Sequence, residues 1–142
     1  MLKIDKERIL SKVDELDGYL QELTEIVPRD LEAYEKSIRD KRACERLLQI
    51  SIETVIDILN IINSKLRLGL PSEEEDLIER IYRKKIISKD LKKIILEMKG
   101  FRNIIVHKYG EVDDELVFEI LSEKISDFDK FRKEIIEYLN KN

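Results

Sequence analysis

The sequence of 142 residues contains few of the residues that interrupt regular structure or build reactive sites. It has 4 Gly, 2 Pro, 1 Cys, 1 His and no Trp. Because hairpin turns usually need Gly, Asn or Pro, this scarcity argues against a β-sandwich with many turns. One Cys cannot form a disulfide within the chain, and one Cys with one His supplies too few ligands for a zinc site. We therefore expect no bound metal and no other cofactor.

Long apolar runs are also absent from the sequence. No uninterrupted run approaches the roughly 18 apolar residues that suggest a membrane span, and the first ten residues, MLKIDKERIL, mix charged and apolar side chains. The single Cys fits a reducing compartment. These features predict a cytoplasmic protein with no targeting segment and no membrane partner.

Apolar and charged residues are both abundant. Apolar residues, most of them Ile and Leu, make up 42% of the chain, and charged residues make up 41%. Many charges, few helix breakers and abundant Ile and Leu are typical of long amphipathic helices. The length fits one domain, residues 1–142. We therefore predict an all-α fold, an antiparallel helical bundle of about five helices.

Apolar side chains recur at helical spacing in five segments. The predicted helices cover about residues 9–27, 31–68, 72–82, 88–110 and 113–139. Pro28 ends the first helix, and Gly69-Leu70-Pro71 ends the second, whose buried stripe is expected to begin with Ile38. Ser72 and Glu75 have the spacing of a capping box. Ser88 and the acidic run from Asp113 are expected to begin the last two helices.

The positive charge is concentrated in one segment. Residues 83–108 carry nine basic and two acidic side chains, a net charge of +7 in a chain whose total is −4, so the remainder carries −11. Such asymmetry indicates a surface for an anionic partner. A helix face covered with solvated lysines would give the same pattern, and charge alone does not separate these two interpretations.

The only His lies in a segment that contains other chemically useful side chains. Asn103 and His107 are four residues apart and share a helix face, while Arg102 and Tyr109 are seven apart on another line. The imidazole can exchange a proton at neutral pH, and the guanidinium can hold a phosphate and stabilise added negative charge. RNA supplies its own nucleophile, the 2′-OH. These groups therefore suit metal-independent RNA cleavage that leaves a 2′,3′-cyclic phosphate.

Spacing alone also allows structural interpretations of the same residues. A His near a helix end often caps carbonyl groups, and an Arg often pairs with a carboxylate. Tyr109 would then be an aromatic residue at the rim. Both kinds of interpretation stay open on spacing alone.

The wider sequence favours one family. The string Phe101-Arg102-Asn103-Ile104-Ile105-Val106-His107-Lys108-Tyr109 resembles the Arg-x4-His-x-Tyr motif of HepT-like toxins, a family within the HEPN superfamily of helical domains. The resemblance runs from about Arg42 to Leu121. Residues 42–53 look like the central helix of the family, and Ile86-Ile87-Ser88 looks like the segment that leads into the motif helix.

This resemblance implies a HEPN-like domain that is the toxin ribonuclease of a type II or VII toxin–antitoxin system. Arg102 and His107 would be catalytic, with Asn103 assisting. Tyr109 would be the hydroxyl that a minimal nucleotidyltransferase antitoxin adenylylates, which silences the enzyme. The protein would form a homodimer around its RNA substrate.

Two lysines near the motif are expected to contact the RNA backbone weakly. These are Lys99 and Lys108. Lys108 stands where relatives often carry an acidic residue, so it could change partner specificity or make the RNA surface more basic.

A second function is compatible with the same fold. The chain could be a non-catalytic HEPN module that binds a nucleotide, or the substrate subunit of a minimal nucleotidyltransferase. The presence of Arg102, His107 and Tyr109 favours the enzyme, because loss of Arg102 or His107 would have indicated the module.

Overall fold

A computed structural model describes residues 3–107 and 112–141, with side chains for residues 5–106 and 112–141. The described residues form helices and connecting turns. Within these two described ranges there are seven helices: α1 (Lys3–Ile26), α2 (Leu31–Lys36), α3 (Ile38–Lys65), α4 (Glu74–Arg83), α5 (Lys89–His107), α6 (Asp114–Glu123) and α7 (Ser126–Lys141). The all-α class is confirmed, and the number of helices exceeds the expected five.

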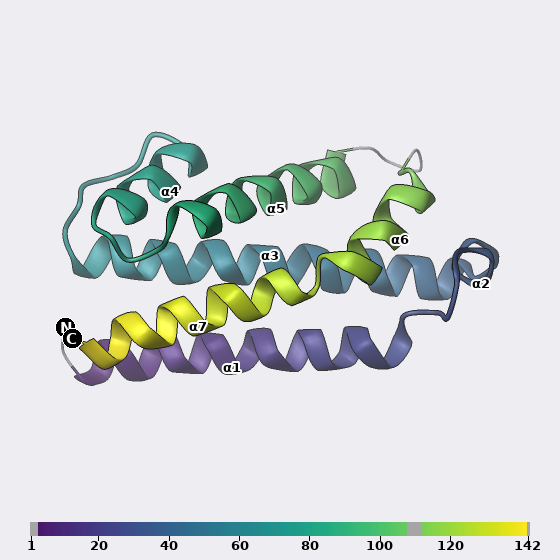
Figure 1. Cartoon of the computed structure of the whole chain (residues 1–142), viewed down its shortest axis with the longest axis horizontal. Coiled ribbons are helices and arrows are strands. Elements are labelled where there is room, and N and C mark those ends of the chain that lie inside the picture. Colours follow the sequence, from purple (N-terminus) through teal and green to yellow (C-terminus); the bar gives the residue numbers. More distant parts are fainter. Residues whose placement is uncertain (1–2, 108–111, 142) are drawn as a thin grey trace.

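Helix α3 is the centre of the bundle (Figure 1). α1 packs along it, α4 and α5 cover another side, and α7 crosses the bundle obliquely beside α1. By length and composition α3 could span a membrane, but 61% of its most apolar window is buried inside the protein. A helix at the centre of a core needs the same composition, so burial accounts for its apolar character.

The helix expected over residues 31–68 is broken at Ser37. This residue is extended, with φ −109° and ψ 100°, and its side chain accepts a hydrogen bond from the Asp40 N–H at 3.2 Å. Ser37 thus ends α2 and caps α3. Serine is favoured at such positions because its hydroxyl can accept a hydrogen bond from a backbone N–H group at the start of a helix. The expectation that Ile38 is buried is wrong: it is 69% exposed at the first position of α3.

The last expected helix is also broken, between α6 and α7. The N–H of Asp127 donates to the Lys124 carbonyl, and that of Phe128 donates to the Ile125 carbonyl, both at 3.1 Å. This turn redirects the chain without Gly or Pro. It allows α7 to bury its own apolar stripe, which comprises Phe128, Phe131, Ile135 and Leu139.

The capping box expected at Ser72 is wrong. α4 begins at Glu74 with Glu73 at the N-cap and no side-chain cap. Ser72 instead donates through its N–H to the Asp76 carboxylate at 3.0 Å. The N-cap is therefore one residue later than a box of Ser72 and Glu75 requires, and the Glu75 carboxylate pairs with Lys99 of α5. Two caps are as expected: Ser88 accepts from the Leu91 N–H at 3.1 Å, and Asp113 caps α6.

Candidate functional site

Helix α5 carries the residues of the expected site on its last turns. Its first half is fixed in the core by Leu91, Ile95 and Met98, which are all buried. Beyond Gly100, residues 101–106 are half-buried, although Phe101 and Ile105 still pack against the core. The C-terminal half of α5 therefore lies at the periphery of the bundle (Figure 1).

Arg102 makes two hydrogen bonds through its guanidinium. Its Nε donates to Oδ1 of Asn103 at 3.0 Å, and its Nη2 forms an ion pair with Oε1 of Glu74. The Arg102 side chain is only 15% exposed. The structure thus brings together two of the three expected catalytic residues and adds Glu74, which the sequence reasoning missed. The only signal in the sequence was the acidic run that precedes a basic helix.

The remaining residues of the expected site lie largely outside the described part of the chain. His107 is the last residue of α5, and its side chain is not among those described. Lys108 and Tyr109 lie wholly outside the described residues. Their roles stay predictions.

The basic segment is partly neutralised within the fold. Three cations of α5 pair with three carboxylates of α4: Arg102 with Glu74, Lys99 with Glu75, and Lys92 with Glu79. The hydrogen bonds from the two lysines hold the pKa values of Glu75 and Glu79 below their usual range. Lys99 therefore already has a partner within the chain, and an RNA phosphate would have to compete with Glu75.

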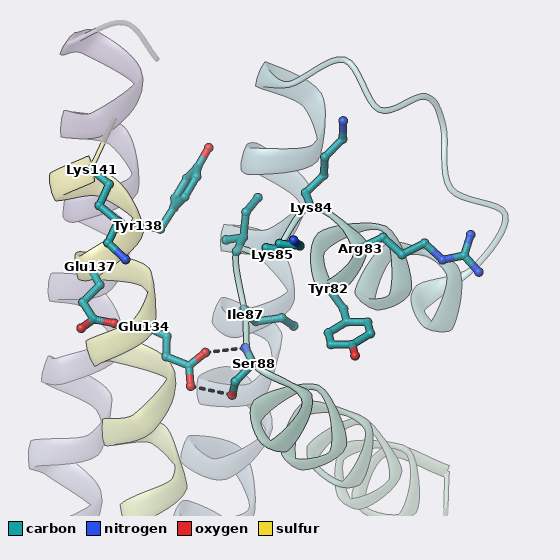
Figure 2. Close-up of a pocket in the computed structure, with 11 residues that line it drawn as sticks. Tyr82, Arg83, Lys84, Lys85, Ile87, Ser88, Glu134, Glu137, Tyr138 and Lys141 are labelled. Carbon is teal, nitrogen blue, oxygen red and sulfur yellow. Dashed lines mark hydrogen bonds between the residues drawn. The ribbon is translucent and has the colours of Figure 1, made fainter.

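A separate hollow lies at the other end of α5. It has a volume of about 770 Å³ and lies between α7 and the turn that joins α4 to α5. Figure 2 shows Glu134 of α7 reaching across to Ser88, where it accepts hydrogen bonds from the N–H at 2.6 Å and from Oγ at 2.8 Å. At about 1.5 Å per residue, Ser88 is roughly 20 Å along the helix from Arg102. The hollow is therefore distinct from the candidate site.

The single Cys is not placed for nucleophilic chemistry. Cys44 is fully buried in α3, and burial raises its pKa to about 11. A thiol with such a pKa is protonated and unreactive at neutral pH. Among the residues that the structure describes, no three His, Cys, Asp or Glu side chains form a group that could hold a metal ion.

Two curated relatives with similar sequences are nucleases. The chain is 28% identical over 139 residues to the tRNA nuclease HepT of Aphanizomenon flos-aquae, covering 98% of this chain and 95% of that relative. It is 33% identical over 84 residues to the mRNA nuclease HepT of Shewanella oneidensis, covering 59% of this chain and 63% of the relative.

Solved structures show the same fold. The chain superimposes with a TM-score of 0.83 on the tri-AMPylated Shewanella oneidensis HEPN toxin in complex with MNT antitoxin. The two are 25% identical, and the match covers 96% of this chain and 99% of that one. The model of one family, described as Ribonuclease HepT-like, matches residues 16–135. Because this match spans most of the chain, the protein belongs to the HepT-like ribonuclease family.

Proposed function

We propose that this protein is the toxin ribonuclease of a toxin–antitoxin pair and that it cleaves RNA without a metal ion. The observation that carries the proposal is the placement of Arg102, Asn103 and His107 on the last turns of α5, at the edge of the bundle. The two HepT relatives named as nucleases of tRNA and mRNA support RNA as the substrate class.

The chemistry follows from the side chains. The imidazole of His107 accepts the proton of an RNA 2′-OH, and the 2′-oxygen forms a bond to the adjacent phosphorus. The bond from phosphorus to the 5′-oxygen breaks, which leaves a 2′,3′-cyclic phosphate and, after protonation, a 5′-OH end. Arg102 stabilises the negative charge that builds up on the phosphoryl oxygens. Asn103 accepts a hydrogen bond from Arg102 and so assists it.

The proposed partner is a minimal nucleotidyltransferase antitoxin that adenylylates Tyr109. The tri-AMPylated toxin bound to MNT antitoxin supports this proposal, since that toxin shares the fold over almost its whole length. Tyr109 follows His107 by two positions in the sequence, so an AMP group there would add negative charge to the segment that carries the proposed catalytic residues. Such a group would block the site by its charge and by its volume.

We also propose that the protein acts as a homodimer in the cytoplasm. One copy offers one imidazole, whereas cleavage needs a proton acceptor for the 2′-OH and a proton donor for the leaving oxygen. Two copies related by a two-fold axis, with their α5 helices facing, would supply both. Lys99 and Lys108 would border the resulting RNA cleft.

Cleavage of tRNA and mRNA by the purified protein in excess chelator tests the nuclease. We expect Arg102→Ala and His107→Ala each to lower the rate by about a hundredfold to ten-thousandfold. Arg132→Ala is the matched control, because Arg132 pairs with Asp17 on another side of the bundle. This variant should cleave RNA at the wild-type rate. Undiminished cleavage by His107→Ala, or a strict need for magnesium, would show that the proposed mechanism is wrong.

Co-expression with a minimal nucleotidyltransferase encoded beside the protein tests the silencing. We expect the wild type to gain the mass of one or more AMP groups and to lose activity. Tyr109→Phe should keep nuclease activity and escape silencing. If Tyr109→Phe gains the same mass as wild type, the modified residue lies elsewhere.

A further inference from the structure

The pair formed by Glu74 and Arg102 joins α4 to α5 through two residues that are 28 positions apart in the sequence. Glu74 is the first residue of α4, and Arg102 lies near the end of α5. Their side chains are 30% and 15% exposed, so water competes with the contact less than it does at an open surface. A contact of this kind restrains both side chains.

The two hydrogen bonds of Arg102 lie on one edge of its guanidinium. Nε–H and Nη2 belong to the same side of this planar group, and they donate to Asn103 and Glu74 respectively. Two fixed donors on one edge set the plane of the whole group. Nη1 has no partner among the residues that the structure describes, so its side of the group is the edge that can donate to a phosphate.

Helix α4 is held in place by its own contacts, so the backbone of Glu74 has a fixed position. Leu77, Ile78 and Ile81 are buried in the core. Arg80 donates to the Leu68 carbonyl at 2.7 Å, and Lys92 lies 4.6 Å from the centre of the Tyr82 ring. The helix from which the Glu74 side chain projects is therefore held in place by contacts that do not involve Arg102.

We propose that Glu74 is a positioning residue that orients Arg102 for contact with the phosphate being cleaved. This inference rests on the proposed function. A carboxylate beside the site lowers its positive charge, so Glu74 does not help RNA to bind. Its contribution lies in the reaction step, where a small displacement of a catalytic group costs much of the rate. If Glu74 instead held Arg102 away from RNA, removing its carboxylate would raise the rate of cleavage.

The test compares two substitutions of similar size at one position. Glu74→Leu removes the acceptor, and Glu74→Gln keeps an amide oxygen that can accept from Nη2. In single-turnover cleavage at saturating RNA, we expect Glu74→Leu to lower the rate by about tenfold to a hundredfold. Its RNA affinity should be equal to that of wild type or tighter. Glu74→Gln should recover most of the rate.

The matched control is Glu79→Leu, which removes another pair between α4 and α5. Glu79 pairs with Lys92 and Arg83 and does not contact Arg102. We expect its rate to equal that of wild type. Equal losses in Glu79→Leu and Glu74→Leu would mean that packing of α4, and not orientation of Arg102, controls the rate, and would overturn the inference.

A double-mutant cycle separates this inference from the proposed function. In the Arg102→Ala background, Glu74→Leu should cause no further loss, because Glu74 acts through Arg102. If Arg102→Ala cleaves like wild type, the proposed function is wrong. If Arg102→Ala is inactive while Glu74→Leu cleaves at the wild-type rate or faster, the positioning role is wrong.

Discussion

Tyr34 carries one of the buried polar atoms that lack a hydrogen-bond partner among the described residues. The residue is fully buried in α2, and its ring lies 5.6 Å from that of Phe118. Its hydroxyl finds no hydrogen-bond partner among the described residues. Burial also raises the pKa of the phenol, so it stays protonated at any ordinary pH. The ring therefore stabilises the core, and the hydroxyl contributes a desolvation cost.

Tyr34→Phe should consequently keep or increase stability. Removing an unpaired buried hydroxyl recovers up to about 1 kcal/mol of unfolding free energy, since its desolvation cost disappears. Tyr34→Ala, which also removes the ring, should cost about 3 to 5 kcal/mol. Urea unfolding followed by circular dichroism measures both. A clear loss of stability in Tyr34→Phe would indicate that the hydroxyl has a partner, such as a buried water.

At the scale of elements, ion pairs contribute part of the contact between α4 and α5. Glu75 and Glu79 of α4 accept hydrogen bonds from Lys99 and Lys92 of α5, which holds both carboxyl pKa values below their usual 4.5. The unfolded chain then binds more protons than the folded chain as the pH falls below about 4.5. The stabilisation is complete above that pH and is lost as the pH falls through the lower pKa values of the folded protein.

Glu79→Gln should therefore reduce stability at pH 7 and have little effect at pH 3. The measurement is the midpoint of urea unfolding for wild type and for the variant. Because the wild-type carboxylate loses its charge in acid and the variant has none at any pH, the two midpoints should converge at low pH. Salt should narrow the gap at pH 7 in the same way, because ions screen exposed pairs. A gap that is equal at both pH values would show that the difference comes from packing and not from the carboxylate.

At the scale of the whole molecule, the peripheral half of α5 leaves apolar side chains incompletely covered. Phe101, Ile104, Ile105 and Val106 are all half-buried. A second copy placed against this surface would cover these side chains and bring two sets of Arg102 and His107 together. The site and the proposed interface would then be formed by the same helix.

We expect a dimer mass in sedimentation at micromolar concentration. Ile104→Glu should shift the protein toward monomer and lower cleavage, because it places a charge in the proposed interface. Leu70→Glu is the control, since Leu70 is 93% exposed in the loop that joins α3 to α4 and should leave the dimer intact. A wild type that sediments as a monomer would rule out this arrangement.

The sequence predicted the fold class, several buried stripes and some of the helix ends of this protein. Helical spacing gave the all-α class and the buried stripes of α1 and α7, because periodicity depends on neighbouring residues alone. Pro28 marked the end of α1 as expected. The same local geometry placed Arg102, Asn103 and His107 on the last turns of one helix, and the motif they form led to the family that the comparisons confirm.

Only the tertiary structure showed the two helix breaks that the apolar spacing did not predict and the ion pairs that join different helices. Ser37 and the turn at Lys124 interrupt segments whose apolar spacing continues through them, since the break depends on how each half packs. Glu74 pairs with Arg102, and Glu75 pairs with Lys99 instead of forming the expected capping box, because folding places α4 beside α5. A charged side chain pairs with the opposite charge that the fold places near it. The separation of two residues along the chain does not predict their distance in space.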